Sequence, residues 1–424
     1  MKDVLGNIIK KQKQEIPVIL RQASVERDSK KKLMNALSSG LIKAVIGPRR
    51  SGKSSLVLQC LSGSNAAYLN FEDEALTFGF SAEEVLEAFD RVYPDHEYIF
   101  FDEIQMFPDW EKLLNRLHRS AKNIVVTGSN SKLLSGELAS SLTGRHLVFE
   151  LLPFSFHEYL LAKGKRNVSD DYLKYLNSGG FPTVVLHEDN TGEFLRALWD
   201  SVILNDIVGR YKSRRPVELR NLLYLVLQQM SARVTSRSLE RAVNKQLSNV
   251  TINKFIGYAE QAYLCCLLQN YSFKPRERVN SEKKVYIFDN GYYTAHRSTP
   301  QADIGKLLEN AVFIDLVRSG FEPNVDLFYY RSRAGHEVDF FVLRNGRPYA
   351  LFQAAFEATD ITTFNRETRS LIAAGDELKI DKLYILTADG IRRSDLIDDK
   401  LIETIPAWEL DSVIATKNLL LPAS

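Results

Sequence analysis

The sequence has 424 residues, more than one ordinary hydrophobic core organises, so two or three domains are expected. Its 45% hydrophobic and 25% charged residues exclude a disordered or fibrous chain and indicate a globular protein. No apolar run reaches the length of about 18 residues that a membrane span needs, and the N-terminus lacks the pattern of a secretory signal. These features predict a cytoplasmic protein that does not bind a membrane.

The charge is distributed unevenly along the chain. The formal net charge of +2 by itself predicts no polyanionic partner. Residues 209–254, however, contain ten basic residues against Glu218 and Glu240, which gives this stretch +8 and leaves −6 for the rest. The basic residues are Arg210, Lys212, Arg214, Arg215, Arg220, Arg233, Arg237, Arg241, Lys245 and Lys254. Such a local asymmetry is typical of a nucleic-acid-binding surface.

The three cysteines predict no disulfide framework and no zinc site. Cys60 stands alone, and Cys265 and Cys266 are adjacent. Each lies in an apolar run, so buried structural thiols in a reducing compartment are expected.

Residues 1–40 have a helical pattern, and residues 41–153 predict a parallel α/β sheet. In the second segment, short apolar runs alternate with helical patterns, as they do when buried strands are joined by helices. The runs are LIKAVIG, AAYLNFED, YIFFDEI, NIVVTGSN and HLVFELL.

The rest of the chain predicts further modules. Residues 154–211 look helical and include the turn Gly179-Gly180-Phe181-Pro182. Residues 216–295 contain three helical patterns, then two extended runs joined by a charged turn, which is the order of a winged helix. From residue 301 a helix, three strands, a helix and a further strand predict another α/β domain.

A glycine-rich segment matches the phosphate-binding pattern G-x-x-x-x-G-K-[ST]. It follows the strand IKAVI and precedes the helical pattern SSLVLQCL, which is the context that this motif requires. Backbone N–H groups there surround phosphates, Lys53 reaches the β- and γ-phosphates, and the Ser54 hydroxyl binds Mg²⁺. The predicted ATP-binding residues are Gly47, Pro48, Arg49, Arg50, Ser51, Gly52, Lys53, Ser54 and Ser55.

An acidic pair, Asp102 and Glu103, ends the apolar run YIFFDEI. Asp102 is predicted to hold Mg²⁺ together with Ser54, and Glu103 to activate the attacking water. A solvated turn is the alternative for such a pair, but the preceding phosphate loop favours catalysis. One strand, AAYLNFED, separates the two motifs in the sequence, which suits the P-loop division with an inserted strand and a catalytic glutamate.

Two further positions are candidates for catalysis. Asn130, with Ser129, follows a predicted strand in TGSN, where a side chain either senses the γ-phosphate or caps a helix. Arg145 precedes the last core strand, where an arginine either stabilises charge in a neighbouring subunit's site or is merely solvated. A role of Arg145 in a neighbouring subunit's site requires a homo-oligomer.

An ordered series of segments resembles the prokaryotic AAA+-type P-loop ATPases with a C-terminal domain of unknown function, in the archaeal-ATPase and STAND-related group. The segments are VIGPRRSGKSSL, YIFFDEIQ, VVTGSN, SLTGRH, LLPFSFHEYL, SGGFPTVV, KKVYIFDNGYY, DIGKLLENAVF, YYRSRAGHEVDFFV and LFQAAF. The resemblance implies an ATPase core over residues 1–153, a helical lid over 154–215 and a winged-helix module over 216–300. It further implies an α/β domain similar to PD-(D/E)-x-K nucleases over 301–424.

The same resemblance assigns roles to particular residues. Arg145 would be an intersubunit arginine, and Gly179 and Gly180 a lid element near the nucleotide. A nuclease of the implied type holds Mg²⁺ with carboxylates, which Glu309 and Asp339 match. On the next strand Gln353-Ala354-Ala355 stands where Glu-x-Lys is expected, so a nuclease-like fold without cleavage is predicted.

The basic stretch predicts a DNA-binding winged helix, with packing against a protein as the alternative. Arg233, Arg237 and Arg241 would contact phosphates. The polar positions that would face a major groove are Asn249, Thr251, Asn253 and Lys254. The sequence therefore favours an ATP-hydrolysing switch or motor associated with double-stranded DNA. The alternative is a slow signalling ATPase that binds a protein partner through its C-terminal half.

Overall fold

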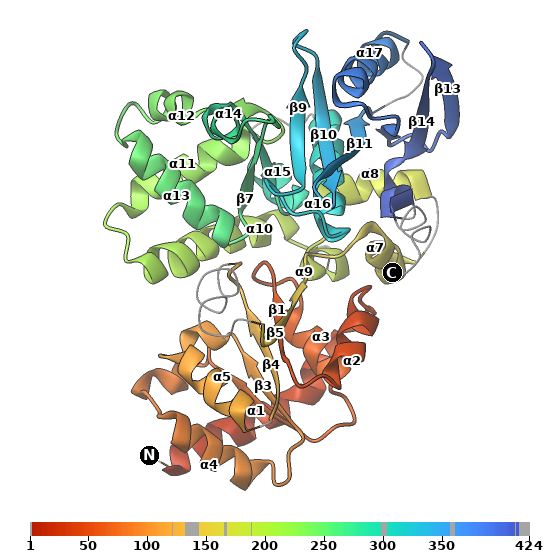
Figure 1. The fold of residues 1–424 in the computed structure, drawn as a ribbon. Helices are drawn as coiled ribbons and strands as arrows, with labels where there is room; N and C mark the ends of the chain where they lie inside the picture. Colours follow the sequence, from red (N-terminus) through yellow and green to blue (C-terminus); the bar gives the residue numbers. More distant parts are fainter. Residues whose placement is uncertain are drawn as a thin grey trace. The chain divides into compact units, whose positions relative to one another are not determined.

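The computed structural model describes residues 2–120, 122–131, 144–164, 168–187, 189–297, 303–356, 361–411 and 413–414. The chain folds into two compact units (Figure 1). The N-terminal unit is Met1–Phe154 with the short segment Gln261–Tyr263, and the C-terminal unit is Ser155–Glu260 with Leu264–Ser424. The segments predicted as lid, winged helix and terminal domain therefore share one compact unit.

The N-terminal unit contains the predicted parallel sheet, with the strand order β2-β3-β4-β1-β5. The strands are β1 (Ile42–Ile46), β2 (Ala66–Asn70), β3 (Tyr98–Asp102), β4 (Asn123–Gly128) and β5 (His146–Glu150). The helices are α1 (Lys2–Gln22), α2 (Lys30–Leu37), α3 (Lys53–Cys60), α4 (Ala82–Val92) and α5 (Trp110–Arg119), with 3-10 turns at Glu74–Phe78 and Ile104–Met106. Strand β4 lies between β1 and β3, so the insertion predicted from the motif spacing is confirmed.

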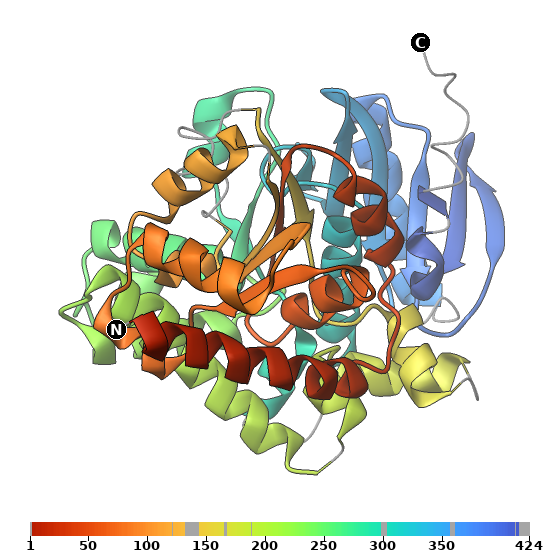
Figure 2. The same ribbon diagram turned by 90° about the horizontal axis from the view of Figure 1, so that it is seen from below.

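Local sequence explains these elements. All five residues of β1 are buried, as expected for a central parallel strand covered by helices on both faces. Helix α4 begins with a capping box in which Ser81 and Glu84 exchange side-chain and backbone hydrogen bonds. Helix α1 continues through Pro17 and runs as one long helix in Figure 2.

The C-terminal unit begins with helices and a glycine turn that is required for packing. The helices are α7 (Phe156–Lys163), α8 (Val168–Ser178), α9 (Pro182–Leu186) and α10 (Thr191–Ser201), followed by a π-helical segment at Val202–Gly209. Gly179 has φ +73°, and a Cβ there would lie 1.9 Å from Oδ1 of Asp289. The Gly180 N–H donates to the other oxygen of Asp289 at 2.7 Å. Close approach to Asp289 therefore accounts for Gly179 within this unit.

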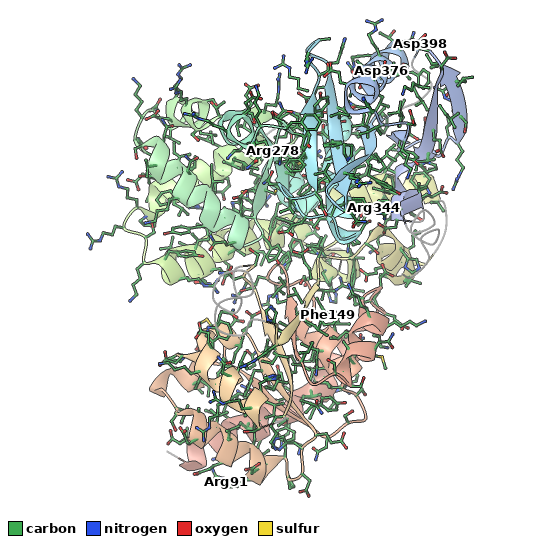
Figure 3. The ribbon with its side chains drawn as sticks, in the orientation of Figure 1. Arg91, Phe149, Arg278, Arg344, Asp376 and Asp398 are labelled. Atoms are coloured by element: carbon green, nitrogen blue, oxygen red, sulfur yellow. The ribbon has the colours of Figure 1, made fainter. Side chains whose placement is uncertain are left out.

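Several helices and a three-stranded antiparallel sheet follow. They are α11 (Pro216–Gln228), β6 (Arg233–Val234), α12 (Ser236–Ala242), α13 (Asn249–Gln261), β7 (Cys265–Gln269), α14 (Pro275–Asn280), β8 (Lys283–Ile287) and α15 (Asn290–His296). The strand order is β6-β8-β7. The predicted helices and hairpin strands are present, whereas β6, α14 and α15 were not predicted. Arg278 of α14, labelled in Figure 3, lies over the rings of Tyr271 and Phe328 and covers them.

A six-stranded sheet completes the C-terminal unit, with the order β13-β14-β12-β11-β10-β9. Its elements are α16 (Ile304–Arg318), β9 (Leu327–Arg331), β10 (Glu337–Arg344), β11 (Arg347–Ala354), α17 (Ile361–Leu378), β12 (Leu383–Thr387), β13 (Arg393–Ile397) and β14 (Lys400–Pro406), with a 3-10 turn at Ala407–Glu409. The hairpin β13–β14 was not predicted from the sequence. A bridge between Asn270 and Tyr329 joins this sheet to the end of β7.

The three cysteines agree with the expectation of buried thiols. Cys60, Cys265 and Cys266 are free and buried, and burial raises the pKa of each thiol. Among the residues that the structure describes, no helix combines the length and the apolar character that crossing a membrane requires.

Candidate functional site: a phosphate loop and an acidic strand end

The phosphate loop runs from the end of β1 to the start of α3, and its backbone permits little beyond glycine at two positions. Gly47 has φ +149°, and a Cβ there would lie 2.1 Å from the carbonyl oxygen of Leu151. Gly52, the residue that caps α3, has φ +93°, in the left-handed region that favours glycine. The turn brings backbone N–H groups to the N-terminus of α3, where the helix dipole favours an anion.

Arg27 holds this loop from outside, a role that the sequence patterns did not reveal. Its guanidinium is buried and donates to the carbonyl oxygens of Ser51 and Leu152, each at 2.6 Å. No motif contains Arg27, so only the tertiary fold identifies it.

Lys53 is buried in the loop and keeps partners that a phosphate can replace. Its ammonium donates to the carbonyl oxygens of Gly47 at 3.2 Å and Pro48 at 2.9 Å. It also lies 3.6 Å from a carboxylate oxygen of Glu103. The Ser51 hydroxyl, also buried, has no hydrogen-bond partner among the described residues. Uncommitted polar groups of this kind fit an anionic ligand in the loop.

Asp102, at the end of β3, receives hydroxyl hydrogen bonds from three elements. Ser54 of α3 donates to its Oδ1 at 2.8 Å, Tyr68 of β2 donates to Oδ2 at 3.1 Å, and Thr127 of β4 also donates to Oδ1. Burial, followed by the neighbouring Glu103 carboxylate, raises the pKa of Asp102 to about 6. The predicted pair of magnesium ligands, Ser54 and Asp102, is thus brought together.

These residues fit Mg²⁺ bound with a nucleotide rather than a metal held by protein alone. Mg²⁺ commonly takes one or two protein ligands, with phosphate and water oxygens completing its octahedron. Within the described part of the chain, no group of three or more His, Cys, Asp or Glu residues is arranged to hold a metal.

Glu103 directly follows β3 in a left-handed backbone conformation with φ +50°. Its N–H donates to Thr127 Oγ1 at 2.9 Å, and its carboxylate accepts a hydrogen bond from Gln105. Burial acts to raise the pKa of Glu103, but the Lys53 ammonium and the Gln105 amide lower it below its usual value. An ionised, oriented carboxylate beside the phosphate loop is suited to accept a proton from water.

The end of β4 contributes the third polar group of the site. Ser129 and Asn130 are both buried there, and Gln105 donates to the Ser129 hydroxyl at 3.4 Å. Because β4 lies between β1 and β3, its carboxyl end adjoins both the loop and the acidic pair. Thr127 contacts both Asp102 and Glu103. The sequence pattern pointed to the segment TGSN, which includes Thr127, but assigned roles only to Ser129 and Asn130 within it.

Arg145 lies away from this group of residues. It is exposed and immediately precedes β5, the edge strand that pairs in parallel with β1. The register pairs His146 with Ile42 at the start of β1, whereas the phosphate loop follows the end of β1. Arg145 is therefore at the opposite end of the sheet from its own chain's loop.

In the C-terminal unit, the predicted residues Glu309 and Asp339 do come together. Oxygens of both carboxylates lie 2.8 Å from the ammonium of Lys284, which comes from β8. The nuclease pattern expects its lysine at Ala355, and Lys284 belongs to no part of that pattern.

Comparisons with known proteins match three successive segments of the chain. Residues 39–160 match the family described as an AAA domain, and residues 169–303 and 304–410 match two domains of unknown function, DUF8612 and DUF4143. The uncharacterized protein MJ1544 of Methanocaldococcus jannaschii is 34% identical over 395 residues, which covers 87% of each chain. An uncharacterized protein of Haemophilus influenzae is 31% identical, over 85% of this chain and 93% of that protein.

A more distant likeness is found to a solved structure, the Walker-type ATPase PABY2304 of Pyrococcus abyssi. It has 15% identity and a TM-score of 0.44, and it covers 64% of this chain and 96% of that one. The chain belongs to the family of the Methanocaldococcus jannaschii protein MJ1544, and its N-terminal unit is the AAA domain of an ATP-binding P-loop ATPase.

Proposed function

We propose that the protein hydrolyses Mg²⁺-ATP and uses the cycle as a switch or motor associated with double-stranded DNA. The observation that carries the hydrolytic part is the convergence of Ser54, Asp102 and Glu103 beside Lys53. The Ser54 hydroxyl lies 2.8 Å from Asp102, and Glu103 lies 3.6 Å from the Lys53 ammonium.

Each residue of this group has a distinct task in the proposed reaction. Ser54 and Asp102 would hold Mg²⁺, which supplies positive charge against the phosphate oxygens. Glu103 accepts a proton from the attacking water as the water oxygen bonds to the γ-phosphorus, and the bond from this phosphorus to ADP breaks. Lys53 exchanges its loop carbonyls for phosphate oxygens. Asn130, with Ser129, orients the water or senses the γ-phosphate.

Arg145 is proposed to act on the site of a second copy of the chain in a homo-oligomer. Its exposed position, at the end of the sheet opposite its own loop, supports a role in trans. Mixing Lys53→Ala and Arg145→Ala proteins tests this role. We expect hydrolysis above that of either variant alone, because mixed oligomers pair an intact loop with an intact arginine. No recovery in oligomers shown to exchange subunits would reject it.

The proposed DNA contact is the module of α11–α13 with its three-stranded sheet, read as a winged helix. Among the described residues, Lys212, Arg214, Arg237, Arg241 and Lys245 are exposed and form no ion pair. Arg220 and Arg233 are instead paired, with Asp200 and Glu282. Exposed cations without carboxylate partners are the groups that phosphates bind by counterion release.

One measurement tests both parts of this function. ATP hydrolysis by the purified chain is measured with and without duplex DNA, alongside Lys53→Ala and Glu103→Gln. We expect stimulation by DNA that both variants lose.

The variant Arg237→Ala/Arg241→Ala should weaken DNA binding and reduce the slope of log K against log salt by about 2. Arg347→Ala, an exposed arginine on β11, is the matched control and should leave both unchanged.

A specific observation favours a second candidate, a signalling ATPase that binds a protein partner through the C-terminal half. Val250 at the start of α13 is 78% exposed, and Val217 at the start of α11 is 66% exposed. Exposed aliphatic side chains at helix starts suit a protein surface better than phosphates do. Hydrolysis that ignores DNA but responds to a co-purifying protein, and loses that response in Val250→Asp, would favour this candidate.

A further inference from the structure

A single buried lysine in the C-terminal unit lies among three carboxylates that come from two other elements. Lys284 of β8 has a side chain that is 3% exposed. Its ammonium is 2.8 Å from Glu309 of α16, 2.8 Å from Asp339 of β10 and 3.0 Å from Glu337 of β10. We refer to these four residues as the lysine–carboxylate cluster.

The ammonium of Lys284 is surrounded by acceptor oxygens that the fold keeps in place. It donates a hydrogen bond to Asp339 at 2.8 Å and forms ion pairs with Glu309 and Glu337. Two of the carboxylates have second partners: the Tyr286 hydroxyl donates to Glu309 at 2.7 Å, and the Ala354 N–H donates to Asp339 at 3.0 Å. The cation and the carboxylates around it are therefore held by the protein itself.

The distances from Lys284 to the carboxylate oxygens are close to the length of about 2.7–2.9 Å that charge-assisted N–H···O contacts have. The neighbouring positions on the chain do not favour a metal. Gln353 uses its amide oxygen to accept the Asp339 N–H at 3.1 Å, and Ala355 has no ligand atom. Glu309 and Asp339, which the resemblance to nucleases suggests as metal ligands, thus surround a cation that the protein itself supplies.

We propose that the ammonium of Lys284 takes the place of a divalent cation between Glu309, Glu337 and Asp339. It closes the carboxylate site of the six-stranded sheet to metal and ties that sheet to β8 of the three-stranded sheet. The proposal concerns the C-terminal unit alone and does not depend on the chemistry proposed for the phosphate loop. It implies that the terminal α/β domain serves as a rigid connection and not as a metal-dependent hydrolase.

The charge balance of the cluster supports a structural role. One ammonium does not neutralise three carboxylates, and Arg233 adds a guanidinium 3.4 Å from Glu337, whose side chain is 28% exposed. Burial, followed by the Asp339 carboxylate, raises the pKa of Glu309. A cluster balanced in this way is stable with Lys284 present and strongly attracts another cation once Lys284 is removed.

The test is the binding of Mn²⁺ to the full chain without nucleotide, followed by electron paramagnetic resonance. Wild type is compared with Asp339→Asn, Lys284→Met and Lys284→Met/Asp339→Asn, and Lys283→Met on the same strand is the matched control. We expect one additional equivalent of bound Mn²⁺ in Lys284→Met only, lost when Asp339 is also replaced. Mn²⁺ bound at the phosphate loop is common to all variants and cancels in these differences.

Two results would overturn the proposal. One is a Mn²⁺ ion in wild type that Asp339→Asn removes, because the site would then be open. The other is a Lys284→Met protein with a native circular dichroism spectrum that gains no Mn²⁺.

A measurement on wild type decides the matter if Lys284→Met does not fold. Native amines are acylated briefly, and the modification of Lys284 and Lys283 is compared by peptide mass spectrometry. We expect Lys284 to react at least tenfold more slowly than Lys283, with no change at 10 mM Mn²⁺. Equal reactivity, or reactivity of Lys284 that rises with Mn²⁺, would mean that a metal can displace the lysine and would refute closure.

Discussion

Each unit of the molecule holds a buried lysine beside buried carboxylates, but the two lysines have different kinds of partner. Lys53 donates to two loop carbonyls, at 2.9 and 3.2 Å, and lies 3.6 Å from Glu103. Lys284 has three carboxylates at 2.8–3.0 Å. A lysine that must receive a phosphate keeps weak, neutral partners that it can exchange. A lysine that holds a structure lies among charged groups that the fold keeps in place.

The carboxylates beside the two lysines differ in their position along the strand that carries them. Asp102 and Glu103 stand at the carboxyl end of β3, where strands of a parallel sheet give way to loops and ligands can approach. Asp339 lies inside β10, and its second oxygen accepts the Ala354 N–H from the neighbouring strand. Position along the strand therefore separates an acid that can act on a ligand from one that is part of the sheet.

The largest expected effect concerns the acid at the strand end. Glu103→Gln should lower ATP turnover by about 10²–10⁴-fold while ATP still binds, because the amide cannot accept a proton from water. Steady-state turnover and binding of a fluorescent nucleotide measure the two quantities. Glu97→Gln, an exposed residue just before the opposite end of the same strand, is the control and should behave as wild type. Full turnover in Glu103→Gln would remove Glu103 from catalysis.

The two lysines should differ most in their contribution to stability. Lys284→Met should lower the free energy of unfolding of the C-terminal unit by about 3–5 kcal/mol, since it leaves buried carboxylates without their cation. Lys53→Met should cost about 1 kcal/mol in the N-terminal unit, because its partners are mainly loop carbonyls. Denaturation followed by hydrogen exchange assigns each loss to its unit. Equal losses would contradict the contrast between the lysines.

Thr127 is expected to position the acidic pair without contacting ATP. Its hydroxyl donates to Asp102 and accepts the Glu103 N–H. Thr127→Ala should therefore lower turnover about tenfold, the loss of one hydrogen bond to a charged group, with little change in ATP affinity. Thr127→Ser keeps the hydroxyl and should restore most of the rate. A serine variant as slow as the alanine variant would point to packing by the methyl group instead.

The smallest expected effect is a pH dependence of Mg²⁺ binding. With the pKa of Asp102 at about 6, the ionised fraction falls from about nine tenths at pH 7 to about one quarter at pH 5.5. About fourfold more Mg²⁺ should then be needed for half-maximal hydrolysis at pH 5.5. Asp102→Asn serves as the baseline, since any change with pH in that variant comes from the nucleotide. If the Mg²⁺ requirement of the wild-type protein changed with pH as it does in Asp102→Asn, the assignment of Asp102 as a Mg²⁺ ligand would be contradicted.

The raised pKa of Asp102 also determines how the stability of the fold changes with pH. The folded state raises the pKa of Asp102 above its unfolded value of about 4, so the ionised carboxylate destabilises the fold. That cost is present above about pH 6 and disappears below about pH 4. It is a cost that a functional acid imposes on its scaffold, offset in part by the hydrogen bonds from the Thr127 and Ser54 hydroxyls.

Much of the N-terminal unit was predictable because its signals are local. Five continuous apolar runs predicted the five strands of the sheet, although β5 at its edge is buried at Phe149 only. A glycine pattern between a strand and a helix predicted the loop where Gly47 and Gly52 adopt positive φ. Asp102 could be paired with Ser54 because parallel strands bring their carboxyl ends to one edge of a sheet. By contrast, Arg27 and Thr127 belong to no spacing that a short motif records.

In the C-terminal unit, sequence alone determined most helices and strands but not the chemistry of the cluster. The pattern located Glu309 and Asp339 and correctly found no lysine at Ala355. It could not reveal that Lys284 supplies the cation, because Lys284 precedes Asp339 by 55 residues and lies on another sheet. Local periodicity decides which segments form helices and strands, since it depends on neighbours in the chain. Which charges share a buried site depends on how those segments pack, and only the tertiary structure decides that.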